Sequence, residues 1–146
     1  LRTIGRLDSL PATARRWIRA TEQETVHLDK LHLTLALSYG GRTEIVDAVR
    51  ELFHEVQDGK LHPDDVNESC IQQYLYTHDL PDPDLLIRTS GETRISNFLL
   101  WQLAYTELYF TPTLWPDFRR RELLLALLEY QRRERRFGRV LSAISS

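Results

Sequence analysis

Apolar residues recur along this chain with two periods, one typical of strands and the other typical of helices. Leucines occupy every second position of Leu31–Leu37, and the apolar run Leu85–Ile87 indicates the end of a second, buried strand. Apolar residues three and four positions apart indicate a helix after Pro11, a second from Thr43 to about Gln57, and a final helix after Asp117. Strands that alternate with helices predict an α/β fold with a mostly parallel sheet flanked by helices.

Shorter stretches add further elements to this pattern. Leu1–Ile4 and Leu108–Phe110 are expected to be short strands, and Asp64–Tyr76 a more polar helix. The apolar run Phe98–Tyr105 is also helix-like, and Gly59 is expected to end the helix that begins at Thr43. The expected caps are Asp8 or Ser9, Thr43 and Asp117, and the expected core residues of the final helix are Leu124, Leu127 and Leu128.

The composition narrows the class of protein. A chain of 146 residues with 42% hydrophobic residues is long enough for one domain with a buried core. The net charge of -2 argues against the broad positive field of a nucleic-acid binder. The single cysteine, Cys70, excludes an internal disulfide, and no apolar run reaches the roughly 18 residues of a membrane span. We therefore expect a cytoplasmic protein without nucleic-acid partners.

Several polar clusters are interpreted as surface features rather than ligand sites. Arg15, Arg16 and Arg19 alternate with an apolar stripe, which indicates a solvated helix face rather than a phosphate patch. The other residues interpreted in this way are His54, His62 and His78, which lack metal-ligand spacing, and Asp82 and Asp84, which lie in a proline-rich turn.

The stretch from Leu85 to Glu107 carries the main candidate site. Arg88 follows an apolar strand, Arg94 comes six positions later, and Ser96 precedes the next apolar run. Two guanidinium groups with a hydroxyl and loop N–H groups suit a group with several anionic oxygens, such as a diphosphate. Glu92 is placed to hold one arginine, and Glu107 is a candidate Mg²⁺ ligand. A salt-bridged surface loop is the alternative that these residue types leave open.

A second candidate is the glycine pair Gly40 and Gly41, which separates the leucine-rich strand from the next helix and precedes Arg42. Adjacent glycines permit a close backbone approach, and ligands in α/β folds bind where strands end and helices begin. Most such pairs are simple turns. The sequence leaves both readings open.

Longer motifs reveal a resemblance. The string RTSGETRISNFLLWQLAYTELYF, then LWPDF and the terminal RRFG, with SYGGR upstream, closely resembles the cis-prenyltransferases of the undecaprenyl diphosphate synthase type. The resemblance covers essentially the whole chain. It implies a homodimeric α/β enzyme that uses Mg²⁺ to condense isopentenyl diphosphate with an allylic prenyl diphosphate, forming cis double bonds. Membrane contact is expected to be at most peripheral, through the lipid product.

The resemblance also assigns roles to individual residues. It implies that Glu107 serves the magnesium site, and that the run Ile95–Leu103 contributes to the subunit interface. The residues that it assigns to the diphosphate of isopentenyl diphosphate are Arg88, Arg94 and Ser96, supported by Glu92. It also implies that Arg136 and Gly138 of the RxG element reach the active site.

The chain departs from the family pattern in two ways. Thr34 and Ser38 stand where relatives usually have asparagines, and the N-terminal motif DGNGRWA, which supplies the catalytic aspartate, is absent. The sequence has no methionine and begins at Leu1. We therefore expect a single partial domain, the C-terminal part of a cis-prenyltransferase, without the N-terminal strands and without the catalytic residue. The alternative is a non-catalytic accessory subunit of a heteromeric cis-prenyltransferase.

The missing motif yields a first prediction. The purified 146-residue chain, incubated with farnesyl diphosphate, isopentenyl diphosphate and Mg²⁺, is expected to give no prenyl transfer, because the catalytic aspartate is absent. Extraction of radiolabelled polyprenyl product measures this directly. Product above the background of heat-treated protein would contradict the expectation.

Overall fold

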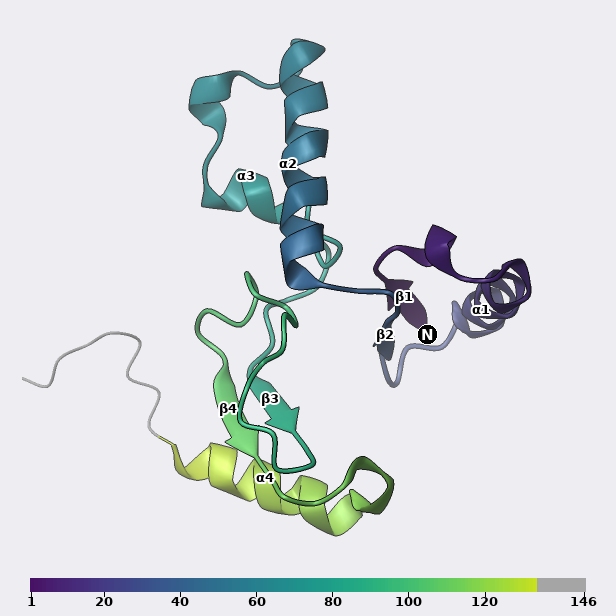
Figure 1. Cartoon of the computed structure of the whole chain (residues 1–146), viewed down its shortest axis with the longest axis vertical. Helices are drawn as coiled ribbons and strands as arrows, with labels where there is room; N and C mark the ends of the chain where they lie inside the picture. The colour runs from purple at the N-terminus through teal and green to yellow at the C-terminus, as the bar shows by residue number, and fades with distance from the viewer. Residues whose placement is uncertain (134–146) are drawn as a thin grey trace, which may run out of the picture. The chain divides into compact units, whose positions relative to one another are not determined.

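The computed structural model describes residues 1–133. The chain divides into two compact units: unit 1 contains Leu1–Pro81 and Asn97–Trp101, and unit 2 contains Asp82–Ser96 and the chain from Gln102 onward. Each unit contains one pair of parallel strands, so the predicted α/β class with parallel pairing is confirmed (Figure 1).

The strands of unit 1 are β1 (Arg2–Ile4) and β2 (Thr34–Ala36), and Ile4, which pairs with Ala36, is buried. Between them the chain passes through a 3₁₀ turn at Leu7–Ser9 and the helix α1 (Ala12–Thr25), the crossover that parallel strands require. The predicted strand Leu31–Leu37 is shortened to three residues, because β1 offers only three residues for pairing. The predicted caps Asp8 and Ser9 were wrong, since Pro11 occupies the N-cap position.

The main helix of unit 1 is α2 (Gly41–Gln57), which buries Glu44, Ala48 and Leu52. Gly59, with φ of 69°, follows its C-terminal end, as the sequence predicted. Glu44 is fully buried and its carboxylate accepts hydrogen bonds from the Tyr39 hydroxyl at 2.5 Å and the Tyr76 backbone N–H at 2.9 Å. Buried charge is tolerated where donors surround it in this way.

The predicted helix Asp64–Tyr76 was too long. The chain instead forms a 3₁₀ turn at Pro63–Asp65 and the short helix α3 (Glu68–Gln72). The break has a local cause: the Asn67 side chain accepts a hydrogen bond from the Cys70 N–H at 3.0 Å, which makes Asn67 an N-cap and starts a new helix.

Unit 2 is built on β3 (Leu85–Arg88) and β4 (Glu107–Phe110), which run parallel (Figure 1). The run Phe98–Tyr105 was predicted to be helical but forms bends and turns. Its residues 98–101 belong to unit 1 and its residues 102–105 to unit 2. Asn97 and Leu99 have φ of 64° and 44°, and a left-handed backbone at these positions is incompatible with a right-handed helix.

The last helix of the described chain is α4 (Arg120–Arg132), and it contacts β4. The predicted cap Asp117 was wrong: it lies in a 3₁₀ turn at Trp115–Asp117, and the helix begins after Arg119, whose N–H donates to Glu122 Oε2 at 3.0 Å. The predicted core stripe was also wrong. Ala126 is buried, whereas the three predicted core residues are 40–49% exposed: Leu124, Leu127 and Leu128. Within residues 1–133, every helix is too short or too polar to cross a bilayer.

The N-terminus of α2 is closed by Asn97, which lies far away in the sequence. The Asn97 carbonyl accepts from the Gly41 N–H at 2.7 Å, and its Oδ1 accepts from the Arg42 N–H at 2.9 Å.

A Cβ on Gly41 would lie 2.8 Å from Leu100 Cγ, and a Cβ on Gly40 the same distance from Asn97 Nδ2. The glycine pair therefore makes room for the chain at Asn97 and Leu100, which favours the turn reading over the ligand reading. The helix starts before Thr43, so that predicted cap was wrong.

An ion-pair cluster connects the chain just after β1, α2 and the chain near Tyr76 within unit 1. Arg6 donates to Asp47 through Nε at 3.0 Å and through Nη2 at 2.6 Å, and the Tyr76 hydroxyl donates to the same carboxylate. Hydrogen bonds from Arg6 first, and from Tyr76, hold the pKa of Asp47 below its ordinary value. Burial first, and then the bond to Asp47, raises the pKa of Tyr76 to about 12.

The cluster predicts an acid-dependent loss of stability. Because the pKa of Asp47 is lower in the folded protein, its contribution is complete above the ordinary carboxyl pKa of about 4 and is lost as pH falls through the folded value. Asp47→Asn should therefore flatten the fall in free energy of unfolding below about pH 4, measured by urea denaturation at a series of pH values. Asp65→Asn, which removes an exposed carboxylate, is the matched control. Identical pH profiles for Asp47→Asn and the unmodified chain would refute the assignment.

The Asn97 cap predicts a specific loss of stability. Asn97→Ala should lower the free energy of unfolding by about 2 kcal/mol, because it removes a helix cap and places alanine at positive φ. Asn97→Asp keeps an oxygen acceptor and should retain most of the stability. Equal urea midpoints for the alanine variant and the unmodified chain would show that the cap contributes nothing.

Candidate functional site

The candidate site begins at Arg88, the last residue of β3, which pairs with Phe110 at the carboxyl end of β4. The loop that follows turns back over the chain after β4. The N–H groups of Ser90 and Gly91 donate to the carbonyls of Thr113 and Thr111, each at 2.9 Å. Both residues have positive φ, 67° and 69°, a conformation natural for glycine and costly for serine. These two loop amides are used inside the protein and are not available to an anion.

Arg88 is half-buried, and its guanidinium forms no ion pair or hydrogen bond within residues 1–133. A partly buried cation without a protein partner is unusual, because desolvation of a charge is costly unless an anion compensates it. Arg88 is therefore the cation of this loop that is available to an external anion.

Arg94 and Ser96 differ from Arg88 in their surroundings. Arg94 Nη1 lies 2.5 Å from Glu92 Oε2, and the Arg94 side chain is 71% exposed. Glu92 thus pairs with one arginine, as expected, and the arginine is Arg94. Ser96 is exposed, with φ of 51°, and directly precedes Asn97. The Arg94 side chain is exposed enough to turn toward another anion, but this would leave the buried Glu92 Oε2 without its cation.

Glu107 lies at the other end of the strand pair. It is the first residue of β4 and pairs with Leu85, three residues before Arg88. Three residues of strand correspond to about 10 Å, and an odd separation along a strand reverses the face to which a side chain points. Within one chain, Arg88 and Glu107 therefore occupy opposite ends and opposite faces of the pair and do not form one site.

The carboxylate of Glu107 is already held on one side. Arg133 Nη1 donates to Glu107 Oε2 at 2.8 Å, whereas Oε1 has no hydrogen-bond partner in the described part of the chain. Within residues 1–133, no group of three or more histidine, cysteine or acidic side chains surrounds a possible metal position. The residues fit a magnesium ion that takes one protein oxygen and completes its shell with diphosphate oxygens and water, a common arrangement for Mg²⁺.

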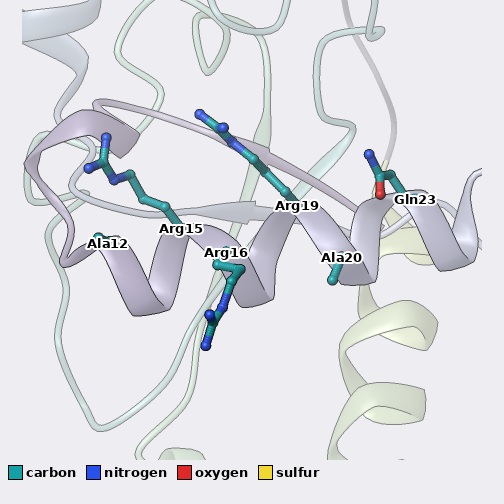
Figure 2. Close-up of a pocket in the computed structure, with 6 residues that line it drawn as sticks. All are labelled: Ala12, Arg15, Arg16, Arg19, Ala20 and Gln23. Atoms are coloured by element: carbon teal, nitrogen blue, oxygen red, sulfur yellow. The ribbon is translucent and has the colours of Figure 1, made fainter.

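The arginines of α1 do not form a second anion site. Figure 2 shows Arg15 and Arg19 on one side of the helix and Arg16 pointing to the other side. Arg15 Nη1 also lies 3.3 Å from Asp8 Oδ1. Side chains of a single helix that diverge in this way favour the predicted solvated face.

Two contributors were not identified from the sequence. Asn97 caps α2, and its preference for helix N-caps is a recognisable signal, but its partner helix begins 56 positions earlier. Arg133 stands in an arginine-rich stretch at the end of the last helix, and its contact with Glu107 leaves no local sequence pattern. The predicted site residues Arg136 and Gly138 lie outside the described residues.

Comparison with known proteins identifies the family. Residues 1–138 match the family model described as "Putative undecaprenyl diphosphate synthase". The tritrans,polycis-undecaprenyl-diphosphate synthase of Methanopyrus kandleri is 53% identical over 95% of this chain and 51% of its own length. The isoprenyl transferase of Heliobacterium mobile is 53% identical over 96% of this chain and 54% of its own length. The chain thus spans about half the length of the curated relatives it matches.

Solved structures agree with this result. Lavandulyl diphosphate synthase from Lavandula x intermedia, in complex with dimethylallyl diphosphate, superposes with a TM-score of 0.92 at 45% identity, over 94% of this chain and 59% of that one. A probable undecaprenyl diphosphate synthase from Campylobacter jejuni superposes with a TM-score of 0.79 at 41% identity, over 94% and 62%. The parallel strand pairs, the RTSGETRIS loop and these matches together assign the chain to the undecaprenyl diphosphate synthase family of prenyltransferases.

Proposed function

We propose that this chain forms part of an enzyme that condenses isopentenyl diphosphate with an allylic prenyl diphosphate to give a cis-polyprenyl diphosphate. Its own residues bind the diphosphate of isopentenyl diphosphate. The half-buried guanidinium of Arg88, which has no anionic partner within residues 1–133, is the observation that carries the proposal. Relatives named isoprenyl transferase and polycis-undecaprenyl-diphosphate synthase support the reaction.

In the proposed binding mode, three side chains donate hydrogen bonds to the diphosphate. Arg88, at the end of a strand, supplies the fixed donor fork that suits phosphate oxygens. Arg94 exchanges its exposed contact with Glu92 for the ligand, and the Ser96 hydroxyl adds a further donor. Glu92 keeps Arg94 in the loop before the ligand arrives. Such donors hold isopentenyl diphosphate so that its alkene can attack the allylic carbon as the allylic diphosphate departs, after which loss of a proton from the isopentenyl unit forms the new double bond.

We further propose that the enzyme is a homodimer in which the site combines residues of two copies. The separation of Glu107 from Arg88 within one chain supports this arrangement. A carboxylate at the far end of the strand pair is placed to contribute to a diphosphate site on another copy of the chain. Glu107 Oε1 is the atom available to Mg²⁺. A bound Mg²⁺ would neutralise negative charge on the diphosphate. Arg136 and Gly138 are predicted to reach the same site, and a cytoplasmic location remains a prediction.

The proposal predicts the effect of removing Arg88. Arg88→Met should weaken the binding of inorganic pyrophosphate at least tenfold, because it removes charge-assisted hydrogen bonds and leaves the apolar part of the side chain. Isothermal titration calorimetry with the purified chain measures this affinity. Arg121→Met removes an arginine that is 82% exposed on α4, and should bind pyrophosphate as the unmodified chain does.

The same titrations distinguish the site from general electrostatic attraction. If Arg88→Met and Arg121→Met weaken binding equally, the net charge of the protein explains the affinity and the proposed site is wrong. A thermal denaturation curve for each variant confirms that the comparison is made between folded proteins.

A further inference from the structure

Arg133 connects the C-terminal end of α4 to the first two residues of β4. Its Nη1 donates to Glu107 Oε2 at 2.8 Å and to the Leu108 carbonyl at 2.9 Å, and its Nη2 donates to Glu129 Oε1 at 2.7 Å. The guanidinium thus contacts two side chains and one backbone group. A planar fork fixed at three points has little freedom to rotate.

The contact is specific to this arginine. Arg133 is the C-cap residue, with φ of -79° and ψ of 129°, so the chain leaves the helix here and the side chain turns toward β4. Its side chain and that of Glu107 are both only 30% exposed. The preceding Arg132 is exposed and forms no ion pair within residues 1–133.

We propose that Arg133 is a positioning residue for the magnesium diphosphate site. It holds Glu107 through Oε2 and leaves Oε1 fixed and available to the cation. This inference rests on the proposed role of Glu107 in binding Mg²⁺. A free glutamate side chain loses rotational freedom when it binds a metal, whereas a carboxylate already held by Arg133 loses less. Partners that orient metal ligands raise metal affinity in this way.

The positive charge of Arg133 does not oppose this role. A Mg²⁺ ion that binds through substrate phosphates would arrive as a magnesium diphosphate complex, which carries a net negative charge. An arginine beside the metal ligand therefore attracts the complex as a whole. The charge of Arg133 is also partly compensated by Glu129, on the preceding turn of α4.

The test compares, among variants, how much Mg²⁺ increases the affinity for pyrophosphate. This gain is the ratio of the dissociation constants without and with Mg²⁺, each measured by isothermal titration calorimetry. Arg133→Met should reduce this gain about tenfold, in the range found when a residue that orients a metal ligand is removed. Arg132→Met removes the same charge from the adjacent position and should leave the gain unchanged. Arg133→Lys, which can donate to Glu107 without the fork, should give an intermediate gain.

The remaining variants separate this inference from the proposed function. Glu107→Gln should also reduce the gain, and the double variant Glu107→Gln, Arg133→Met should be no worse than Glu107→Gln, because both changes act through one carboxylate. If Glu107→Gln leaves the gain unchanged, the proposed metal role of Glu107 fails. If Glu107→Gln reduces the gain but Arg133→Met does not, the metal role stands and the inference about Arg133 is wrong.

Thermal denaturation tests whether Arg133 has a purely structural role. A lower melting temperature for Arg133→Met, combined with an unchanged gain, would mean that Arg133 anchors α4 and does nothing for the metal. A larger gain in Arg133→Met would mean that Arg133 competes with Mg²⁺ for Glu107, which would also overturn the inference.

Discussion

Leu85 pairs with Glu107 and Arg88 pairs with Phe110, and this parallel register decides which side chains of unit 2 can act together. It places Arg88 beside the loop that carries Arg94 and Ser96, and it removes Glu107 from that group. A shift of one residue would reverse the face of every side chain on β4. The division between an arginine end and a carboxylate end is therefore a direct result of backbone pairing.

The arginines of this chain differ in what compensates their charge. Arg6 and Arg133 are bound by carboxylates and connect elements within their own units, and Arg94 forms an exposed pair with Glu92. Arg88 has neither kind of partner within the described residues. An arginine already committed to a protein carboxylate gives up that contact to bind a ligand, whereas Arg88, half-buried and unpaired, can bind an external anion without such a loss.

Much of the secondary structure could be predicted from the sequence, but the contacts between residues far apart in the chain could not. The end of α2 near Gln57, the strand at Leu108–Phe110 and the parallel class follow from periodicity. The run Phe98–Tyr105 has helical periodicity, yet the positive φ values before and within it impose turns. The residue types of the site loop indicated an anion, whereas the pairing of Glu107 with Arg133 depends on how α4 packs against β4, which no local pattern encodes.

The hydrogen bonds of the loop after β3 have a consequence for how an anion is recognised. Many phosphate sites rely on the N–H groups of a helix start or a glycine loop, which are dipoles without net charge. Here the carbonyls of Thr113 and Thr111 accept hydrogen bonds from the N–H groups of Ser90 and Gly91. The charged donors of this loop are guanidinium groups, which stay charged throughout the physiological pH range. Ligand affinity should then follow ionic strength steeply, while its pH dependence reflects the titration of the ligand's own phosphates.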